Sequence, residues 1–411
     1  MKLPRTIKIS KCRLCSHEKL LKIHSFGNLY VSNFVSKKDI NNGIKAPLNL
    51  VYCKNCKLLQ LQHSAPQEIM YKKFYWYRSG VTNTMKNALR NIFLTVKKMS
   101  ILDKGDTVLD IGANDGTLLK YFKREKYITI GCEPAKNLTK FLRKNCKYVF
   151  NNFWNSKDLK EIIKTEKIKK PKLITAIGMF YDLENPSKFI ADAAEVLDDD
   201  GVFIAQLMCL ESMLKKNDLG NICHEHLEFY SYDSLKYLFE KNGLKIFKME
   251  ENEVNGGSYR IFCKKNISRS ITYKEKTSLS DVKKFVQRVK LNKKKCLNFL
   301  NNATKKGLKV FVYGASTKGN TILQFLNFDN KIIKYAVERN KQKIGASTIG
   351  SNIKIISEKM SKKLKPDYYL VLPWHFKKEI INREKEYIKK GGSLIFPLPK
   401  IQIINKRNLN L

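Results

Sequence analysis

Between residues 105 and 264 the chain alternates short apolar segments with segments of helical spacing. TVLDIG, YITIGCEP, KLITAIGM and GVFIAQLM have the length and composition of buried strands, and the helical TLLKYFKRE follows the first of them. Alternation of this kind predicts a parallel sheet in a doubly wound α/β domain. The closing segment, KIFKMEENEVNGGSYRIFCKK, predicts a β-hairpin that turns at NGG.

The rest of the chain predicts further domains, since 411 residues exceed one ordinary core. Residues 10–65 have short strands and turns, residues 66–100 turn helical, and residues 275–306 form a lysine-rich helix with one apolar side. A second strand–helix series begins at KVFVYGAS. We therefore expect four parts: an N-terminal domain (1–66), a central α/β domain (67–268), a linker helix (269–306) and a smaller Rossmann-like α/β domain (307–411).

The charge of the chain does not predict a nucleic-acid partner. A formal net charge of +42 attracts phosphates, but lysine occurs in every segment, and the sequence has no Arg-rich arm and no RNA-binding module. Small anionic molecules that carry phosphates are compatible with it. No apolar signal region opens the sequence, and no apolar stretch approaches about 20 residues, so we expect a cytoplasmic protein without membrane contact.

Two C-x-x-C pairs near the N-terminus predict a metal site. They are C-R-L-C at 12–15 and C-K-N-C at 53–56. Each turn presents two thiolates to one ion, so Cys12, Cys15, Cys53 and Cys56 would complete a tetrahedral zinc site. Four cysteines leave no open position for water, which predicts a structural rather than a catalytic zinc. The other six cysteines are expected to be small buried hydrophobes.

The segment VLDIGANDGTLLKYF predicts the site of a cationic ligand. Its glycines lack the G-x-G-x-x-G spacing of a pyrophosphate loop, and its acidic residues suit the sulfonium and ammonium of S-adenosylmethionine. Glu133, at the end of the next strand, is placed to bond the ribose hydroxyls. Together these features predict a class I methyltransferase sheet. The predicted donor-binding residues are Asp110, Gly112, Asn114, Asp115, Gly116, Glu133 and Phe153; Phe153 and its neighbour Trp154 suit the adenine and the core equally.

The stretch CHEHLEFY, residues 223–230, follows the strand GVFIAQLM and therefore lies near the ligand edge of the sheet. A histidine with an ordinary pKa of about 6.5 suits removal of a C–H proton beside a ketone. Glu225 would hold an imidazole in one tautomer or bond the substrate. A metal site and a purely structural loop are the alternatives. Farther on, VFVYGASTKGNTILQF leads from a strand through a glycine turn into a helix near Lys318, an arrangement that suits a nucleotide or diphosphate but also a plain turn.

In these segments the chain resembles the three-domain, S-adenosylmethionine-dependent C-methyltransferases of deoxysugar biosynthesis, which act on nucleotide-diphosphate 4-keto sugars. The resemblance runs over nearly the whole chain. Its motifs, in order, are the paired C-x-x-C segments, YRSGVTNTM, DIGANDGTLL, CHEHLEFYS, NGGSYRIF, YGASTKGNT, VERNKQKIG and PWHF.

The resemblance implies a zinc-binding N-terminal domain, a central methyltransferase and a C-terminal domain that helps to bind the nucleotide sugar. His226 matches the family's general base and Glu225 its neighbouring carboxylate. The catalytic candidates are thus His226, Glu225, His224, Tyr77 and Cys223. The substrate-binding candidates are Tyr75, Asn255, Lys318, Asn320 and Arg339.

Two residues depart from the family pattern. Cys223 stands where tyrosine is common, and Asp182 where histidine is common. Because a thiol is a weaker hydrogen-bond donor than a phenol, stabilisation of an enolate or the acceptor itself can differ here.

Taken with the resemblance, the motifs predict C-methylation of a 4-keto sugar through an enolate. The alternatives are O-methylation of a sugar hydroxyl and, less favoured, methylation of nucleic acid, for which the N/D-P-P-Y/F element is absent from IGMFYDLENP at 177–186.

Overall fold

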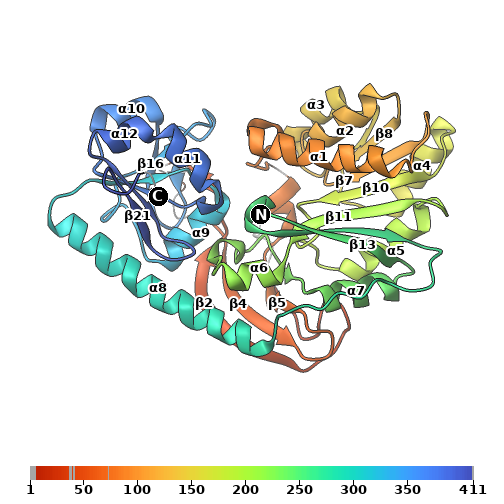
Figure 1. Ribbon diagram of the computed structural model, residues 1–411, viewed down its shortest axis with the longest axis horizontal. Coiled ribbons are helices and arrows are strands. Elements are labelled where there is room, and N and C mark those ends of the chain that lie inside the picture. Colours follow the sequence, from red (N-terminus) through yellow and green to blue (C-terminus); the bar gives the residue numbers. More distant parts are fainter. Residues whose placement is uncertain (1–5, 37–38, 40–41, 73, 410–411) are drawn as a thin grey trace.

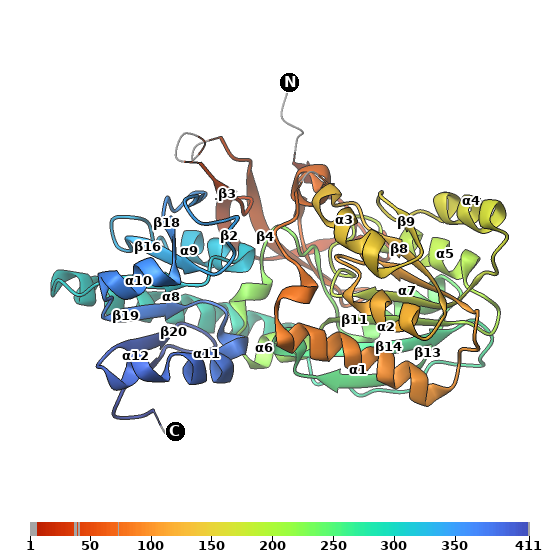
Figure 2. The same cartoon turned by 90° about the horizontal axis from the view of Figure 1, so that it is seen from above.

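A computed structural model describes residues 6–36, 39, 42–72 and 74–409, and its strands form four sheets within these ranges (Figure 1). The outermost ends of the predicted N- and C-terminal domains, residues 1–5 and 410–411, lie outside the described residues. Two α/β units flank a smaller β unit, and Figure 2 shows strands β2 (Leu20–Tyr30) and β4 (Lys45–Cys53) between them. No helix of the described residues is long and apolar enough to cross a membrane.

The central sheet has seven strands in the order β13-β14-β11-β10-β7-β8-β9. Their bounds are β7 (Thr107–Ile111), β8 (Ile128–Cys132), β9 (Tyr148–Phe150), β10 (Pro171–Ile177), β11 (Val202–Met208), β13 (Lys245–Asn252) and β14 (Ser258–Lys264). Within this sheet β7, β8, β9, β10 and β11 run parallel, whereas β14 is antiparallel to its two neighbours, β11 and β13. The chain winds outward from β7 in both directions, which confirms the doubly wound α/β fold.

Helices cover both faces of this sheet, as Figure 1 shows. Alternate residues of each strand face opposite ways, so Val108 packs with one set of helices and Leu109 with the other. The first set is α1 (Asn83–Met99), α2 (Thr117–Arg124) and α3 (Lys136–Asn145), and the second is α4 (Ser156–Glu166), α5 (Pro186–Val196) and α7 (Tyr232–Lys241). Burial on both faces explains why the strands read as continuous apolar runs.

One local prediction differs from the structure. The segment 66–100 is not one helical stretch: short helical turns at Glu68–Lys72 and Ser79–Val81 precede α1, and residues 74–78 have no helix. Thr82 caps α1 and accepts a hydrogen bond from the amide of Met85, so the helix begins where a capping side chain is available. The predicted hairpin is confirmed, since β13 and β14 pair antiparallel and the chain turns at NGG, with a 3₁₀ turn at Val254–Gly256.

The C-terminal sheet has eight strands in the order β21-β20-β19-β15-β16-β18-β17-β3. Their bounds are β3 (Phe34–Val35), β15 (Val310–Tyr313), β16 (Tyr335–Glu338), β17 (Ser347–Thr348), β18 (Lys354–Ser357), β19 (Tyr368–Val371), β20 (Ser393–Phe396) and β21 (Gln402–Ile404). Parallel pairing of β15, β16, β18, β19 and β20 gives the expected Rossmann-like core. The helix α8 (Leu279–Lys305) runs along one side of the molecule to reach this unit (Figure 1).

Two strands are paired outside the part of the sequence in which they stand. The N-terminal sheet has the order β12-β5-β4-β2, so that β12 (Glu228–Phe229), from the central part of the chain, pairs with β5 (Leu59–Leu61). In turn, β3 of the N-terminal part pairs with β17 at the edge of the C-terminal sheet. One buried apolar cluster accordingly includes Phe26, Leu214, Val286 and Ile322, residues from all parts of the chain.

A buried ion pair fixes the contact between the N-terminal and central parts. Arg13 Nε lies 3.6 Å from Glu228 Oε1, and the two side chains are 2% and 0% exposed. Arg13 also donates to the carbonyl oxygen of Leu61 (2.5 Å) and to Ser64 Oγ (3.0 Å). The guanidinium thus joins the first cysteine turn to β5 and β12.

Replacing Arg13 with Met should lower the free energy of unfolding by about 3–5 kcal/mol, because Glu228 would remain buried without its counter-charge. Chemical denaturation of the zinc-loaded protein measures this. The double variant Arg13→Met/Glu228→Met should recover part of the loss, since no uncompensated charge is left. Equal unfolding free energies for wild type and Arg13→Met would contradict the assignment of a structural role to this pair.

Candidate active site

A cavity of about 320 Å³ opens at the carboxyl ends of β7, β8 and β10. Its walls include Gly112 and Asn114 after β7, Glu133 after β8, and Gly178 and Met179 after β10. The strand order reverses here, since β8 lies on one side of β7 and β10 on the other. Ligands of open α/β sheets bind at this point.

The turn after β7 allows a close approach to the sheet edge. Gly112 has a φ of +72°, and a Cβ there would meet Met179 Cγ at 2.7 Å. The amides of Gly112 and Ala113 donate to the carbonyl oxygen of Cys132 at 2.9 and 3.0 Å, which fixes the turn against the end of β8. Only glycine therefore fits at the first position of the turn.

Glu133 is the carboxylate at the cavity edge. Its oxygens accept hydrogen bonds from the amides of Asn114 and Ala135, both at 2.8 Å. Burial raises the pKa of Glu133 to about 7, against the effect of these two amides. Asp110 is close behind but does not line the cavity; its Oδ1 accepts from Thr175 Oγ1 at 2.6 Å, and burial raises its pKa to about 7 as well.

Aromatic side chains form much of the remaining wall, namely those of Tyr71, Tyr75, Tyr77, Phe153 and Trp154. Trp154 donates its indole N–H to the carbonyl oxygen of Phe189 at 3.2 Å, which fixes its ring. The structure thus brings Phe153 and Trp154 to the cavity together, and Trp154 also packs against the apolar core of the central domain.

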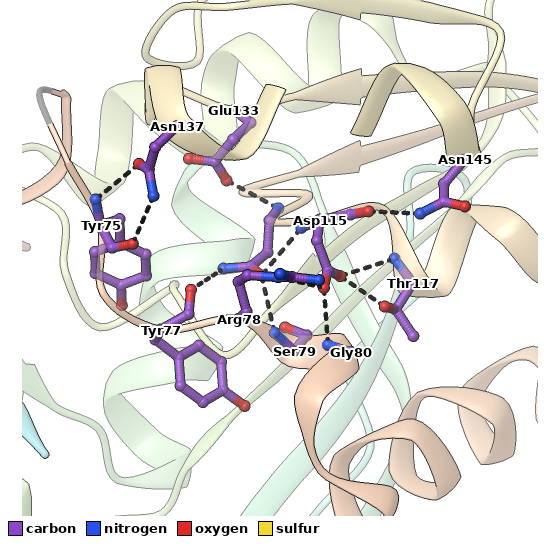
Figure 3. A network of polar contacts seen from close by, with 11 residues as sticks. Tyr75, Tyr77, Arg78, Ser79, Gly80, Asp115, Thr117, Glu133, Asn137 and Asn145 are labelled. Atoms are coloured by element: carbon purple, nitrogen blue, oxygen red, sulfur yellow. Dashed lines mark hydrogen bonds and ion pairs between the residues drawn. The ribbon is translucent and has the colours of Figure 1, made fainter. Parts of the chain in front are cut away.

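The segment 75–80 crosses over the glycine turn, as Figure 3 shows. Asn114 Oδ1 accepts from the amide of Ser79 at 2.9 Å, and Asp115 Oδ2 accepts from the amide of Gly80 at 2.9 Å. Asn137 bonds both the amide and the carbonyl of Tyr75, at 2.9 and 3.0 Å. These bonds place Tyr75 and Tyr77 beside the cavity.

The same bonds remove two predicted residues from the donor set. Asp115 is directed toward Gly80, Arg78 and Thr117 and does not line the cavity, and neither does Gly116, which begins α2 with a φ of +75°. Of the seven predicted donor-binding residues, four line the cavity: Gly112, Asn114, Glu133 and Phe153. The interpretation of Asp115 as a ligand for a cation overlooked the amides of segment 75–80 as its partners.

His226 lies behind this cavity in the loop between α6 (Leu210–Lys215) and β12. Its Nδ1 is 2.8 Å from the carbonyl oxygen of Asn221, and Tyr181 packs edge-on against the ring at 4.6 Å between centroids. Because a carbonyl only accepts, Nδ1 carries the hydrogen and Nε2 is the free, basic nitrogen of the neutral ring. Burial and the nearby charge of Lys318 hold the pKa of His226 well below its ordinary value, so the ring is neutral at neutral pH.

His224 points elsewhere. It is 1% exposed, and its Nε2 lies 2.9 Å from the carbonyl oxygen of Ala46 in β4. Burial lowers the pKa of His224 to about 4. The geometry thus gives His224 a contact with the N-terminal sheet and no place in the cavity lining, so of the two histidines His226 is the stronger candidate for a catalytic role.

Two carboxyl groups and a thiol lie near His226 in a largely buried environment. Glu225 and Cys223 are buried, and Asp182 lines the cavity. Burial raises the pKa of all three, and for Asp182 the carboxylate of Glu225 raises it further. Within the described residues Asp182 Oδ1 and Glu225 Oε2 have no hydrogen-bond partner. Such groups have the means to accept hydrogen bonds from a bound ligand.

The loop that carries these residues is fixed from two sides. The carbonyl oxygen of Tyr181, after β10, accepts from the amides of Leu227 (2.7 Å) and Glu228 (3.1 Å). From the N-terminal part, Leu61 donates its amide to the carbonyl oxygen of Leu227 at 2.9 Å. Tyr71 Oη donates to the carbonyl oxygen of Glu225 at 2.9 Å. Sequence reasoning missed Asn221 and Tyr181 as partners of His226. The contact with Asn221 runs through a backbone carbonyl that any residue supplies, and the ring contact with Tyr181 joins segments that are distant in the sequence.

The predicted substrate-binding residues are scattered. Tyr75 lines the cavity, whereas Arg339 is exposed at the end of β16 and Asn320 is buried with its Nδ2 3.3 Å from the carbonyl oxygen of Asn33. Asn255 precedes Gly256, whose Cα faces Asp218 and Trp374. Lys318 reaches the central part of the molecule instead of an open phosphate site.

The four N-terminal thiols come together. All four sulfurs of Cys12, Cys15, Cys53 and Cys56 lie within 4.8 Å of one another. Gln60 Nε2 donates to Cys12 Sγ at 3.2 Å, a bond that orients this ligand. An all-sulfur set at this spacing fits a structural zinc ion and leaves no position for catalysis.

Comparison with known proteins agrees with this arrangement. Residues 12–71 match a zinc-binding domain family, residues 84–248 a methyltransferase domain family, and residues 253–399 the family described as C-methyltransferase C-terminal domain. The C-methyltransferase NovU of Streptomyces niveus is 25% identical in an alignment of 411 positions that covers 97% of this chain and 97% of NovU.

Among solved structures, magnesium protoporphyrin IX methyltransferase from Synechocystis, with bound S-adenosylmethionine, covers 43% of this chain and 78% of its own (10% identity, TM-score 0.32). A methyltransferase from Clostridium acetobutylicum covers 43% of this chain and 91% of its own (14% identity, TM-score 0.35).

The sheet order and the cavity at its switch point define a class I methyltransferase that uses S-adenosylmethionine. Glu133 at the cavity edge, the close approach at Gly112 and the aromatic wall fit this cofactor. With the zinc-binding part before it and the C-methyltransferase part after it, the chain matches the three-domain C-methyltransferases in each of its parts.

Replacing Glu133 with Gln should weaken S-adenosylmethionine binding about tenfold or more, because charge-assisted hydrogen bonds become neutral ones. In the wild type the affinity should fall as the pH drops through about 7, where Glu133 takes up a proton, and this pH dependence should flatten in the variant. Titration calorimetry between pH 6 and 8 measures both. Glu161→Gln, an exposed change on α4, is the matched control.

Replacing Cys56 with Ser should reduce the zinc content below one ion per chain and lower the melting temperature, because metal binding contributes directly to folding. Atomic absorption and thermal unfolding give the two readouts. Cys296→Ser, a change at a buried thiol of α8, should leave the zinc content at one. Full zinc content in Cys56→Ser would exclude this residue as a ligand.

Proposed function

We propose that the protein methylates a carbon atom next to the ketone of a nucleotide-diphosphate 4-keto sugar. The relationship to the C-methyltransferase NovU over 97% of the chain supports a carbon acceptor, and the resemblance of the motifs to nucleotide-sugar C-methyltransferases supports the sugar. The observation that carries the mechanism is the state of His226, a neutral imidazole whose Nδ1–H is bonded to Asn221 and whose Nε2 is free within the described residues. A fixed, unprotonated nitrogen is what a general base for a C–H proton requires.

In this mechanism His226 Nε2 takes the proton from the carbon beside the ketone, and the C–H electron pair forms an enolate. S-adenosylmethionine, held by Glu133 and the aromatic wall of the cavity, would supply a methyl group on a cationic sulfur. The enolate carbon would take this methyl group, and the electron pair of the S–CH₃ bond would stay on the neutral sulfur that leaves. Holding both reactants in one site accounts for much of the rate.

The chain's other residues bind and orient. Glu133 would accept hydrogen bonds from the ribose hydroxyls. Phe153 and Trp154 would pack against the adenine, and Gly112 would leave room for the donor at the turn. Tyr75 and Tyr77 would face the acceptor from segment 75–80, next to Asp182 and the Glu225–Cys223 pair. Aromatic walls and buried carboxyl groups exclude water from the enolate, which lengthens its life.

O-methylation of a sugar hydroxyl is the second candidate. It is favoured by Cys223, because a buried thiol whose pKa is raised is a weak donor for an enolate oxygen. In that reaction the same nitrogen of His226 would take a hydroxyl proton. The two reactions differ at the ring carbon next to the ketone, which only a C-methylating enzyme activates.

Incubation in D₂O with a panel of nucleotide-diphosphate 4-keto sugars, with and without S-adenosylmethionine, tests the proposal. We expect exchange of one ring hydrogen for deuterium and, with the donor, a product heavier by one methylene unit, both detected by mass spectrometry. Methylation without exchange at that carbon, in the absence or presence of the demethylated donor, would indicate an oxygen acceptor instead.

His226→Gln should lower both exchange and methylation by about 10²–10⁴-fold, because the base is lost. Donor affinity by calorimetry should stay within about twofold, since His226 does not line the donor cavity. His17→Gln, at an exposed histidine, is the control for a change of the same chemistry. If His226→Gln still exchanged the ring hydrogen for deuterium at the wild-type rate, this histidine would be excluded as the base.

A further inference from the structure

Lys318 is the second residue of α9 (Thr317–Phe325) in the C-terminal part of the chain, yet its ammonium group lies against the central part. Lys318 Nζ is 3.0 Å from Asn221 Oδ1 and 3.3 Å from Met208 Sδ, at the end of β11. Within the described residues it has no ion-pair partner. Ser316, the capping residue, accepts from the amide of Gly319 at 3.0 Å, so part of the helix terminus is already satisfied.

Asn221 connects this lysine to the proposed base. Its side-chain oxygen accepts from Lys318 Nζ, and its main-chain oxygen accepts from His226 Nδ1 at 2.8 Å. Asn221 is 3% exposed and ends the 3₁₀ turn Leu219–Asn221. Asp218, just before this turn, accepts from the indole N–H of Trp374 at 3.0 Å. The C-terminal part therefore holds this turn at two points.

The charge of Lys318 acts in the same direction as its hydrogen bond. An ammonium group near a buried imidazole disfavours the imidazolium form and leaves Nε2 unprotonated. Several other titratable groups face Lys318 or His226 from the elements packed around them. They are Asp218, Cys223 and Glu225 on the same loop, Tyr181 and Asp182 after β10, and His375 after β19.

Burial raises the pKa of the carboxyl groups in this set and keeps the pKa of His375 low, at about 3. The surroundings of His226 thus offer little negative charge to favour protonation of its ring. The cation of Lys318 bonds Asn221, in the turn that fixes the ring of His226.

We propose that Lys318 is a positioning residue for His226: it holds Asn221, whose carbonyl fixes the Nδ1–H tautomer, so that Nε2 stays the proton acceptor. The role differs from phosphate binding, which the glycine turn and helix of this segment suggested from the sequence. It rests on the proposed function only in that His226 is the base; the tautomer and its dependence on Lys318 are properties of the protein alone. Docking of the C-terminal part would then complete the base.

Nitrogen-15 NMR of histidine-labelled protein tests this without substrate. The chain has six histidines, and His226→Gln identifies the signal. In the wild type we expect a neutral ring with hydrogen on Nδ1. Lys318→Met should move the titration of His226 to higher pH and mix the two tautomers, and Lys318→Arg should retain most of the wild-type behaviour. Lys359→Met, an exposed lysine on α10 (Glu358–Leu364) without a contact to this site, removes the same charge as a control.

Asn221→Ala is the second variant, because it removes the acceptor of Lys318 but keeps the main-chain carbonyl. It should shift the tautomer balance in the same direction as Lys318→Met. Thermal unfolding of each variant confirms that the fold is retained. The proposal would be overturned if the tautomer and the titration of His226 were the same in both variants as in the wild type.

Kinetics separate the two roles of the lysine. For Lys318→Met we expect kcat to fall about 10- to 100-fold and the acid limb of kcat/KM to move to higher pH. A rise in KM for the nucleotide sugar, with kcat and the acid limb unchanged, would assign Lys318 to phosphate and overturn the positioning role. Wild-type protein that shows the expected tautomer but exchanges no ring hydrogen would contradict the proposed function and leave the NMR result standing.

Discussion

The structure depends on how the loop 217–229 is fixed, because this loop contacts the N-terminal β unit, the central α/β unit and the C-terminal α/β unit. Its β12 pairs with β5 of the N-terminal sheet, its main chain bonds Tyr181 of the central unit, and its first turn receives Trp374 from the C-terminal unit. A loop with one support would let an imidazole move by more than a reaction tolerates. Here the proposed base lies where three separately built surfaces converge, and each contributes one side of its environment.

Low polarity is the second property of this region. Buried groups with altered pKa values, Glu133 and Asp110 at the donor cavity and Asp182 and Glu225 near His226, surround a space lined by aromatic rings. In such surroundings a charge that develops during reaction interacts strongly with fixed groups. The net charge of +42, by contrast, belongs to the lysines of the surface and does not define the site.

The sequence predicted the parts whose signals are local. Runs of apolar residues predicted β7, β8, β10 and β11, and cysteine spacing predicted a cluster that the structure brings within 4.8 Å. It did not reveal partners that are distant in the sequence: Asp115 bonds segment 75–80, His224 bonds Ala46, and Lys318 bonds Asn221. Strands of two residues, such as β3 and β12, have no periodicity to detect. Their pairing is decided by tertiary contacts alone.

The pairing of β3 with β17 has a consequence for folding during synthesis. Phe34 and Val35 are made long before Ser347 and Thr348, with which they pair, because a long stretch of sequence separates the two strands. β3 must therefore stay without this partner while the intervening residues are made, and contacts of such long sequence separation form slowly. A nascent chain halted before β17 would leave β3 unpaired and open to neighbouring chains, so protection of this strand from aggregation depends on the synthesis of β17.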